Sequence, residues 1–426
     1  MSPGSPRPRP IHLVQLVHGY PPAVGGVEIA TRDRCERLVA EHGFQVTVLT
    51  TDCYTIDGFR DRNEPRIPRQ HHEVQKGVEV RRFSVRTRFA PALRLLARAA
   101  YHARLPRNDL LRTLYHGPIC PGMLQAVRNL KPDVICAASF PLNHMRYPFL
   151  IHGSRPPVVL IGAVHTNEAW SFDRPNLLRL VNRSYATIAH TNAEREWLIE
   201  RGADPGLVRV AGIGIDSDAL RPRLGSFRAA HNIPDDGYFI AYFGQLGAHK
   251  GIDVLISALP ALLTRCPNAW LVVAGSRTPF VPHLQQLILG LPPEARARIR
   301  LLMNLDDQTK ADLLGDCDVF ASPSQAESFG ITTIEAWSLA KPVIVGDAPS
   351  QRSVVEDGIT GLIIPHGSRQ RLVAALERLA DPALRARLGE AGRRVAGERY
   401  DRRRIDSMYA ELFRSAVAAT GRRTLA

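Results

Sequence analysis

The sequence contains little lysine: five of its 55 basic residues are lysines, at positions 76, 131, 250, 310 and 341, and the other fifty are arginines. It has no apolar run of the roughly 18 residues needed to span a bilayer. Its first ten residues, MSPGSPRPRP, lack the apolar core of a signal peptide. We therefore expect a cytoplasmic protein, either free or peripheral on the cytosolic face of a membrane.

The six cysteines have no CxxC or other metal-ligand spacing. They stand in apolar segments of a chain far too long for a small disulfide-stabilised protein, so we expect reduced, buried thiols. No DxD-type carboxylate pair stands near the end of an expected strand. We expect no metal and no other cofactor.

The positive charge is concentrated in one half of the chain. The 426 residues carry a formal charge of +14, of which +11 lies before residue 216 and +3 after it. Such a distribution indicates an anionic partner for the N-terminal half, which could be nucleic acid, a lipid surface or a phosphorylated substrate. An arginine-rich proteome is the alternative explanation.

Apolar runs alternate with amphipathic stretches along the N-terminal half. Strands are predicted at 11–17 and 44–50, joined by a glycine-rich turn and a helix over about 27–42. This βαβ unit implies a parallel sheet with a right-handed crossover. Further strands are predicted at 133–137, 158–164 and 187–189.

The same alternation returns after residue 237. Strands are predicted at 238–244, 270–275, 318–324 and 342–347, and helices at 251–265, 329–340 and 368–379. The preceding segment, 212–237, is rich in glycine, proline and aspartate and is predicted to be a linker. The chain is thus expected to form two Rossmann-like domains, which bind ligands at the carboxyl ends of their strands.

The most informative segment is 322–361, SPSQAESFGITTIEAWSLAKPVIVGDAPSQRSVVEDGITG. Glu327 is expected in a loop after a strand, and Glu335 nearly two turns into the following helix. The N-terminus of this helix carries a positive partial charge of roughly half an electron, which suits a diphosphate. The residues expected to offer unpaired N–H groups there are Phe329, Gly330, Ile331 and Thr332.

The E-x7-E spacing in this segment, followed by DG-x-x-G, resembles glycosyltransferase family 4. This resemblance implies retaining enzymes of the GT-B fold, an α/β architecture of two Rossmann-like doubly wound domains that face a central cleft. In that family the first glutamate binds hydroxyls of the donor sugar, and the second binds the ribose of the nucleotide. Carried over, Glu327 would hold the sugar and Glu335 the ribose.

A second match is GQLGAHKG at 244–251, where the family usually has a glycine, an arginine and Lys-Gly. Lys250 fits the leaving-group lysine that neutralises the diphosphate, and Gly244 fits the glycine. Gln245 replaces the arginine and so lacks its charge. A fixed cation stabilises a developing phosphate better than a neutral donor does, so this departure puts donor handling in question.

Two further matches lie in the N-terminal half. Gly25 and Gly26 belong to a glycine-rich loop that resembles the acceptor or phosphate loop of the family, and His18 stands beside it. His165 follows the strand predicted at 158–164, where the family often has a histidine that contacts the donor sugar or stabilises the transition state. A tight turn needs no ligand and a single histidine can be structural, so both alternatives remain open.

The resemblance covers most of the chain and implies three parts. An acceptor-binding domain is expected at 1–215, a nucleotide-sugar-binding domain at 216–400, and a helix at 401–426 that crosses back to the first domain. The implied reaction is the transfer of a hexose-type sugar from a UDP-, GDP- or similar sugar to a hydroxyl of a glycan, glycolipid or small molecule. Front-face transfer is favoured because no carboxylate is placed as a nucleophile.

Nine arginines and one acidic residue lie between Arg81 and Arg112. Arg94 and Arg98 are spaced to share a helical face, which favours a basic amphipathic helix at an anionic membrane surface. A solvated arginine-rich helix is the alternative.

Three other classes of protein compete with this interpretation of the whole chain. They are a catalytically weak homologue, another GT-B enzyme such as a nucleotide-sugar epimerase or a phosphorylase, and a nucleic-acid-binding protein. The last is disfavoured because no recognition module is visible.

Overall fold

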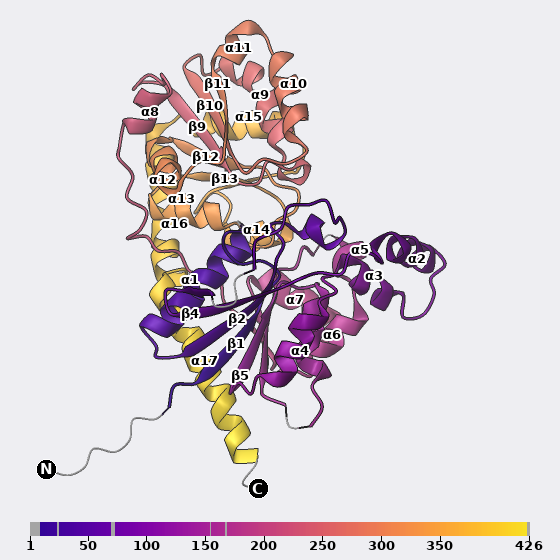
Figure 1. Ribbon diagram of the computed structural model, residues 1–426. Coiled ribbons are helices and arrows are strands. Elements are labelled where there is room, and N and C mark those ends of the chain that lie inside the picture. The colour runs from indigo at the N-terminus through magenta and orange to yellow at the C-terminus, as the bar shows by residue number, and fades with distance from the viewer. Residues whose placement is uncertain (1–8, 24, 70–72, 154, 167, 424–426) are drawn as a thin grey trace, which may run out of the picture. The chain divides into compact units, whose positions relative to one another are not determined.

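The computed structural model describes residues 9–23, 25–69, 73–153, 155–166 and 168–423 (Figure 1). These residues form two compact units. Unit 1 comprises the chain up to Ala211 together with the residues from Arg403 onward, and unit 2 comprises Gly212–Arg402. Each unit is built around one sheet with helices on both faces.

The sheet of unit 1 has eight strands in the order β3-β4-β2-β1-β5-β6-β7-β8, and only β3 runs antiparallel to its neighbour. Its strands are β1 (His12–Leu16), β2 (Gln45–Thr51), β3 (Glu73–Gln75), β4 (Val78–Phe83), β5 (Val134–Ala138), β6 (Val158–Ile161), β7 (Ala186–Ala189) and β8 (Val208–Val210). Its α-helices are α1 (Gly26–Ala40), α2 (Ala90–His102), α3 (Asn108–His116), α4 (Pro121–Asn129), α5 (Ala169–Phe172), α6 (Pro175–Val181), α7 (Asn192–Glu200) and α17 (Arg402–Arg423).

Both faces of this sheet are covered, which explains why β1, with the sequence HLVQL, is mostly apolar. Leu13 packs with α1 and α17 on one face, whereas Val14 packs with α4, α6 and α7 on the other. The C-terminal helix α17 is part of the first of these cores, through Tyr409 and Phe413. Unit 1 is therefore completed by residues from the far end of the chain.

The sheet of unit 2 is fully parallel, with six strands in the order β11-β10-β9-β12-β13-β14. Its strands are β9 (Tyr238–Phe243), β10 (Ala269–Gly275), β11 (Ile299–Met303), β12 (Val319–Ser322), β13 (Val343–Gly346) and β14 (Leu362–Ile364). Its α-helices are α8 (Ser226–Ala230), α9 (Ile252–Leu263), α10 (Val281–Leu289), α11 (Pro293–Ala297), α12 (Asp307–Asp316), α13 (Ile331–Ser338), α14 (Pro349–Val354), α15 (Arg369–Arg378) and α16 (Pro382–Arg399).

Two segments differ from their sequence-based predictions. The predicted linker 212–237 is packed into unit 2, because the Asp316 carboxylate accepts hydrogen bonds from the N–H groups of Gly225, Phe227 and Arg228. The basic segment 81–112 is not one helix: it contains the end of β4, then α2 and most of α3. In Figure 1, α2 and α3 stand away from the sheet of unit 1, next to α5.

No helix among the described residues is long and apolar enough to cross a membrane.

Candidate functional site

Lys250 and Glu327 lie on loops that follow the neighbouring strands β9 and β12. The Lys250 Nζ is 2.7 Å from the Glu327 Oε2, and both side chains are largely buried. The two loops pack closely at Gly251, which has a φ of +67°, and a Cβ there would lie 2.3 Å from the carbonyl oxygen of Pro323. Only glycine suits this position. The structure therefore brings together two residues that the motifs placed in one site.

A second lysine–glutamate pair lies beside the first turn of α13. Lys310, on α12, has its Nζ 2.5 Å from the Glu335 Oε1. The Glu335 Oε2 is buried and has no hydrogen-bond partner within the described part of the chain. Because α13 begins at Ile331, Glu335 is its fifth residue. The expected position nearly two turns into the helix is thus corrected to just over one turn.

The start of α13 is fixed by Gly330, which has a φ of +90°. A Cβ on Gly330 would lie 2.4 Å from the Nε2 of Gln351, which donates to the Phe329 carbonyl oxygen at 3.3 Å. Ile331 and Thr332 open the helix, so their N–H groups have no intrahelical acceptor. The Phe329 side chain is 1% exposed and packs edge-on against Tyr400. It belongs to the core of unit 2, and the family-based expectation of a donor contact applies at most to its backbone.

Gln245 has an exposed side chain on a fixed backbone. Its carbonyl oxygen accepts hydrogen bonds from the Tyr242 hydroxyl and from the N–H of Gly247, both at 2.9 Å. The N–H of Gly244 donates to the Ala274 carbonyl oxygen at 3.1 Å, which extends the pairing of β9 with β10. Gly244 and Gln245 thus lie at the carboxyl end of β9, before the turn that carries Lys250.

In unit 1 the glycine-rich loop surrounds a buried carboxylate, Glu28, which the motif analysis did not identify. A Cβ on Gly25 would lie 2.4 Å from the Glu28 Oε2, and Gly26 is the first residue of α1. The His18 Nε2 is 3.1 Å from the Glu28 Oε1, and the His18 Nδ1 is 2.7 Å from the Ser139 hydroxyl. Burial alone would raise the pKa of Glu28, but the charge and hydrogen bond of His18, together with a backbone hydrogen bond at Glu28, outweigh burial and the pKa is lowered. In this structure Gly25 makes room for Glu28.

His165 follows β6, as the sequence predicted. Its ring is stacked on that of Phe172, with centroids 5.3 Å apart and planes 6° apart. The His165 Nδ1 is 3.6 Å from the Glu168 Oε1, and a quarter of the His165 side chain is exposed. The ring is therefore oriented by residues from its own loop and from α5.

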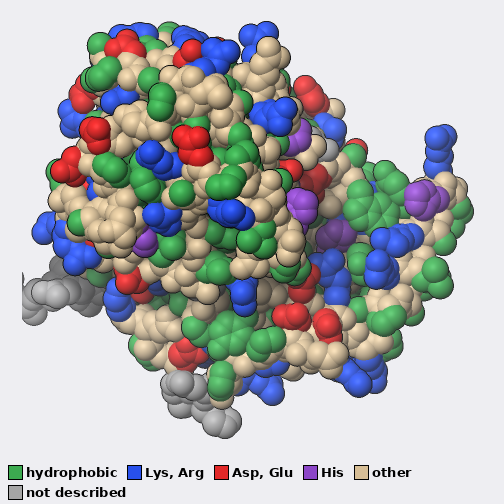
Figure 2. Space-filling view, turned by 90° about the horizontal axis from the view of Figure 1, so that it is seen from above, with side chains coloured by type: hydrophobic (Ala, Val, Ile, Leu, Met, Phe, Trp, Pro, Cys, Tyr) green, Lys and Arg blue, Asp and Glu red, His purple; other side chains and the backbone are tan. Residues whose placement is uncertain are grey.

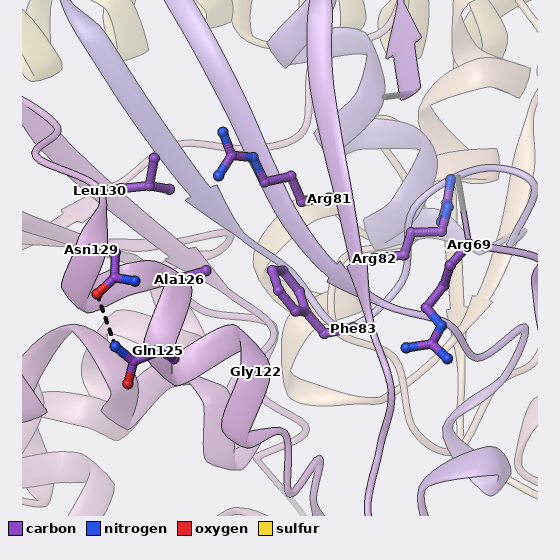
Figure 3. A pocket seen from close by; sticks show the side chains of 9 residues that line it. All are labelled: Arg69, Arg81, Arg82, Phe83, Gly122, Gln125, Ala126, Asn129 and Leu130. Atoms are coloured by element: carbon purple, nitrogen blue, oxygen red, sulfur yellow. Dashed lines mark hydrogen bonds between the residues drawn. The ribbon is translucent and has the colours of Figure 1, made fainter. Parts of the chain in front are cut away.

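Unit 1 also has a groove of about 970 Å³ between β4 and α4 (Figure 3). Arg81 and Arg82 line it, but Arg81 is paired with Glu79, and Arg82 is held by Glu73 and by backbone carbonyl groups. Gln125 and Asn129 on α4 are hydrogen-bonded to each other. These two arginines and these two amides thus already have partners within the protein.

Comparison with known families identifies the chain. The family described as Glycosyltransferase Family 4 matches residues 24–219, and the one described as Glycosyl transferases group 1 matches residues 225–395. The chain belongs to glycosyltransferase family 4. The prediction of this family, which the motifs made, is confirmed.

Relatives of this family 4 chain are known from several bacteria. It is 30% identical to a D-inositol 3-phosphate glycosyltransferase of Saccharomonospora viridis, over 54% of this chain and 56% of that protein. The chain thus aligns with little more than half the length of such relatives. It is 24% identical, over 95% and 97% of the two chains, to a GDP-mannose:cellobiosyl-diphosphopolyprenol alpha-mannosyltransferase of Xanthomonas campestris.

The fold of the family 4 chain matches solved structures. Sucrose-phosphate synthase from Thermosynechococcus elongatus superposes with a TM-score of 0.69 and 20% identity, covering 96% of this chain and 100% of that one. The prediction of the GT-B fold class, with two Rossmann-like parallel sheets, is confirmed.

Proposed function

We propose that this family 4 glycosyltransferase moves a hexose from a nucleotide diphosphate sugar to a hydroxyl group of a glycan, glycolipid or small molecule, with retention of the anomeric configuration. The observation that carries this proposal is the pair of lysine–glutamate contacts. Lys250 contacts Glu327, in the loop before α13, at 2.7 Å, and Lys310 contacts Glu335, within α13, at 2.5 Å. Together they place two cations, two carboxylates and a helix N-terminus around the carboxyl ends of β9 and β12.

Each element of this arrangement suits one part of such a donor. Lys250 and the first N–H groups of α13 supply positive charge for a diphosphate. The buried Oε2 of Glu335 lacks a hydrogen-bond donor among the described residues, and a ribose hydroxyl would supply one. Glu327, beside Lys250, is an acceptor for hydroxyls of the sugar. The relative named for GDP-mannose supports a nucleotide-sugar donor.

The proposed reaction is a front-face transfer. The bond between the anomeric carbon and the diphosphate oxygen breaks, and its electron pair leaves with the diphosphate. The acceptor hydroxyl then attacks the same face of the sugar, and its proton passes to the departing phosphate. Lys250 and the α13 N-terminus stabilise the charge that develops on the leaving group, so we propose no metal. We assign His165 to contact with the transferred sugar.

For the acceptor, we propose a phosphorylated or lipid-linked molecule at an anionic membrane surface. The N-terminal half carries +11 of the net charge. On α2, Leu95 and Leu96 are 72% and 54% exposed beside the exposed Arg94 and Arg98. Hydrophobic and basic side chains accordingly lie next to each other over α2 and α3, at the right of Figure 2. An apolar stripe flanked by cations is typical of helices that bind lipid surfaces.

A donor screen tests the proposal. Thermal shifts are measured with UDP-, GDP- and ADP-sugars, and the stabilising donor is then incubated with soluble and lipid-linked acceptors. We expect one base to be preferred, and a product whose anomeric proton shows the configuration of the donor. Inversion would exclude the front-face mechanism. Absence of any stabilising nucleotide sugar would exclude the proposed donor class.

A further inference from the structure

The loop that carries His165 is held at both ends by buried charged side chains that take no part in the proposed chemistry. These are Glu194, on α7, and Arg112, on α3. Neither belongs to a motif of the family, and Arg112 lies in the basic segment 81–112 that the sequence predicted at a membrane surface. Their contacts are with the backbone on either side of His165.

Glu194 fixes the residues just before His165. The side chain is 1% exposed, and its Oε1 accepts hydrogen bonds from the N–H groups of Ala163, at 3.0 Å, and Val164, at 3.3 Å. Its Oε2 accepts from the N–H of His190, at 2.7 Å, in the loop after β7. One carboxylate therefore joins the loops that follow β6 and β7.

The Glu194 carboxylate lies close to the backbone of Gly162. A Cβ on Gly162 would lie 1.7 Å from the Glu194 Oε1, so a side chain at position 162 would displace it. Glu194 itself is fixed at the start of α7, where its N–H donates to the Thr191 side chain at 3.1 Å. The carboxylate is thus held from its own helix and from the backbone that it binds.

Arg112 fixes the residues just after His165. Its guanidinium donates to the carbonyl oxygens of Trp170, at 2.8 Å, and Asp173, at 2.9 Å, and more weakly to that of Ala169. It thereby binds carbonyl groups in the short helix α5 and directly after it, of which that of Ala169 also accepts a hydrogen bond from the N–H of Asp173 at 3.0 Å. The guanidinium also lies over the rings of Tyr101 and Trp170, 4.9 and 5.5 Å from their centroids.

These contacts determine where the imidazole of His165 stands. Its ring is stacked on Phe172 of α5, the helix that Arg112 binds, and its backbone follows directly from the segment that Glu194 binds. A shift at either end would move the ring. Misplacement of a reacting group by about 1 Å can cost up to about 100-fold in rate.

We infer that Glu194 and Arg112 are positioning residues for His165, which fix its loop from opposite ends. This inference depends on the proposed function, since it presumes that His165 acts in transfer. Arg112 also connects α3, the neighbour of α2, to this loop. Because its side chain is buried, Arg112 is not itself a membrane contact.

The test uses the full chain with a soluble acceptor and the donor found in the screen. Glu194→Gln and Arg112→Lys are each expected to lower kcat about 10- to 100-fold. The Kd of the nucleotide should change less than about twofold, since the residues that we propose bind it lie in unit 2. The matched controls are Glu196→Gln on α7 and Arg179→Lys on α6, both at exposed positions, which should leave kcat unchanged.

His165→Ala separates failure of the inference from failure of the proposed function. If His165→Ala lowers kcat and the two variants do so as well, combining either with His165→Ala should add little further loss. Near wild-type kcat in both positioning variants, with His165→Ala impaired, would overturn the inference alone. Unimpaired His165→Ala would remove the proposed role of His165, and the inference with it. If Glu194→Gln does not fold, Glu194→Asp replaces it, and if Arg112→Lys does not fold, Phe172→Leu on α5 replaces it. Loss of the fold in the replacements as well would indicate a purely structural role and overturn the inference.

Discussion

The Lys250 ammonium and the Glu327 carboxylate form an ion pair in which the side chains are 13% and 16% exposed. Removing one partner of a buried pair leaves the other charge uncompensated. The two residues therefore have to be tested separately for effects on catalysis and on stability. In the proposed reaction the lysine serves the diphosphate and the glutamate serves the sugar.

We expect Glu327→Ala and Lys250→Ala each to reduce transfer about 100- to 1,000-fold, the range found when a group that stabilises transition-state charge is removed. Both variants should retain the far-UV circular dichroism of the wild type. Glu294→Ala, at an exposed position of the same unit, is the charge control. Near wild-type turnover in both site variants would contradict the proposed mechanism.

The contact between Glu335 and Lys310 leads to a separate prediction about nucleotide affinity. Glu335→Gln replaces an anionic acceptor at the expected ribose position and leaves Lys310 without its partner, so the Kd of the nucleoside diphosphate should rise about tenfold. The wild type should discriminate against the 2′,3′-dideoxy nucleotide, and the variant should discriminate much less. Calorimetric titration of both ligands against both proteins measures this. Equal discrimination would show that Glu335 does not bind the ribose.

Gln245 occupies the position at which the family usually has an arginine. Its side chain is exposed, so an arginine can be accommodated there without displacing a buried group. Gln245→Arg should lower the KM for the donor or raise kcat, because it adds a cation near the proposed diphosphate site, whereas Gln245→Met should do neither. A loss of activity in Gln245→Arg would instead indicate a glutamine adapted to an unusual donor.

The central strands could be predicted from the sequence because they are buried on both faces and their sequences are mostly apolar. The strand β4, VEVRRF, could not, since it carries three charged residues near the edge of the sheet. The segment 212–237 looked like a linker because Asp316, which holds it, lies about 90 residues away in the sequence. Local patterns do not reveal such distant partners.

The same reason explains which site residues were found. Lys250, Glu327 and Glu335 stand in motifs, whereas Lys310, Glu28 and Glu194 are single charged residues whose roles depend on contacts that folding creates. Arg112 lies in the basic segment 81–112, which the sequence predicted to be an amphipathic helix at a membrane surface or a solvated helix. In the structure it is buried.

Burial also makes Glu194 a source of pH-dependent stability. Desolvation raises its pKa to about 7, against the opposing effect of hydrogen bonds from three backbone N–H groups. A carboxyl group whose pKa is higher in the folded state favours folding most below its unfolded pKa, and this contribution is lost as the pH rises towards 7. Between pH 5 and pH 8, the denaturation midpoint of unit 1 should therefore fall more in the wild type than in Glu194→Gln. Parallel pH profiles would contradict this pKa.

The last prediction concerns binding of the exposed face of α2 to anionic vesicles. If Leu95 and Leu96 insert into an anionic surface, replacing both with glutamate should abolish co-sedimentation with vesicles that contain phosphatidylglycerol, because it removes apolar area and adds repulsion. Leu289→Glu is the matched control, since this leucine is 58% exposed on α10 of unit 2. Transfer to a soluble acceptor should be unchanged in all variants. Wild-type protein that fails to bind the vesicles at low salt would rule out the membrane surface and leave a soluble phosphorylated acceptor or an arginine-rich proteome as the explanation of the +11 charge.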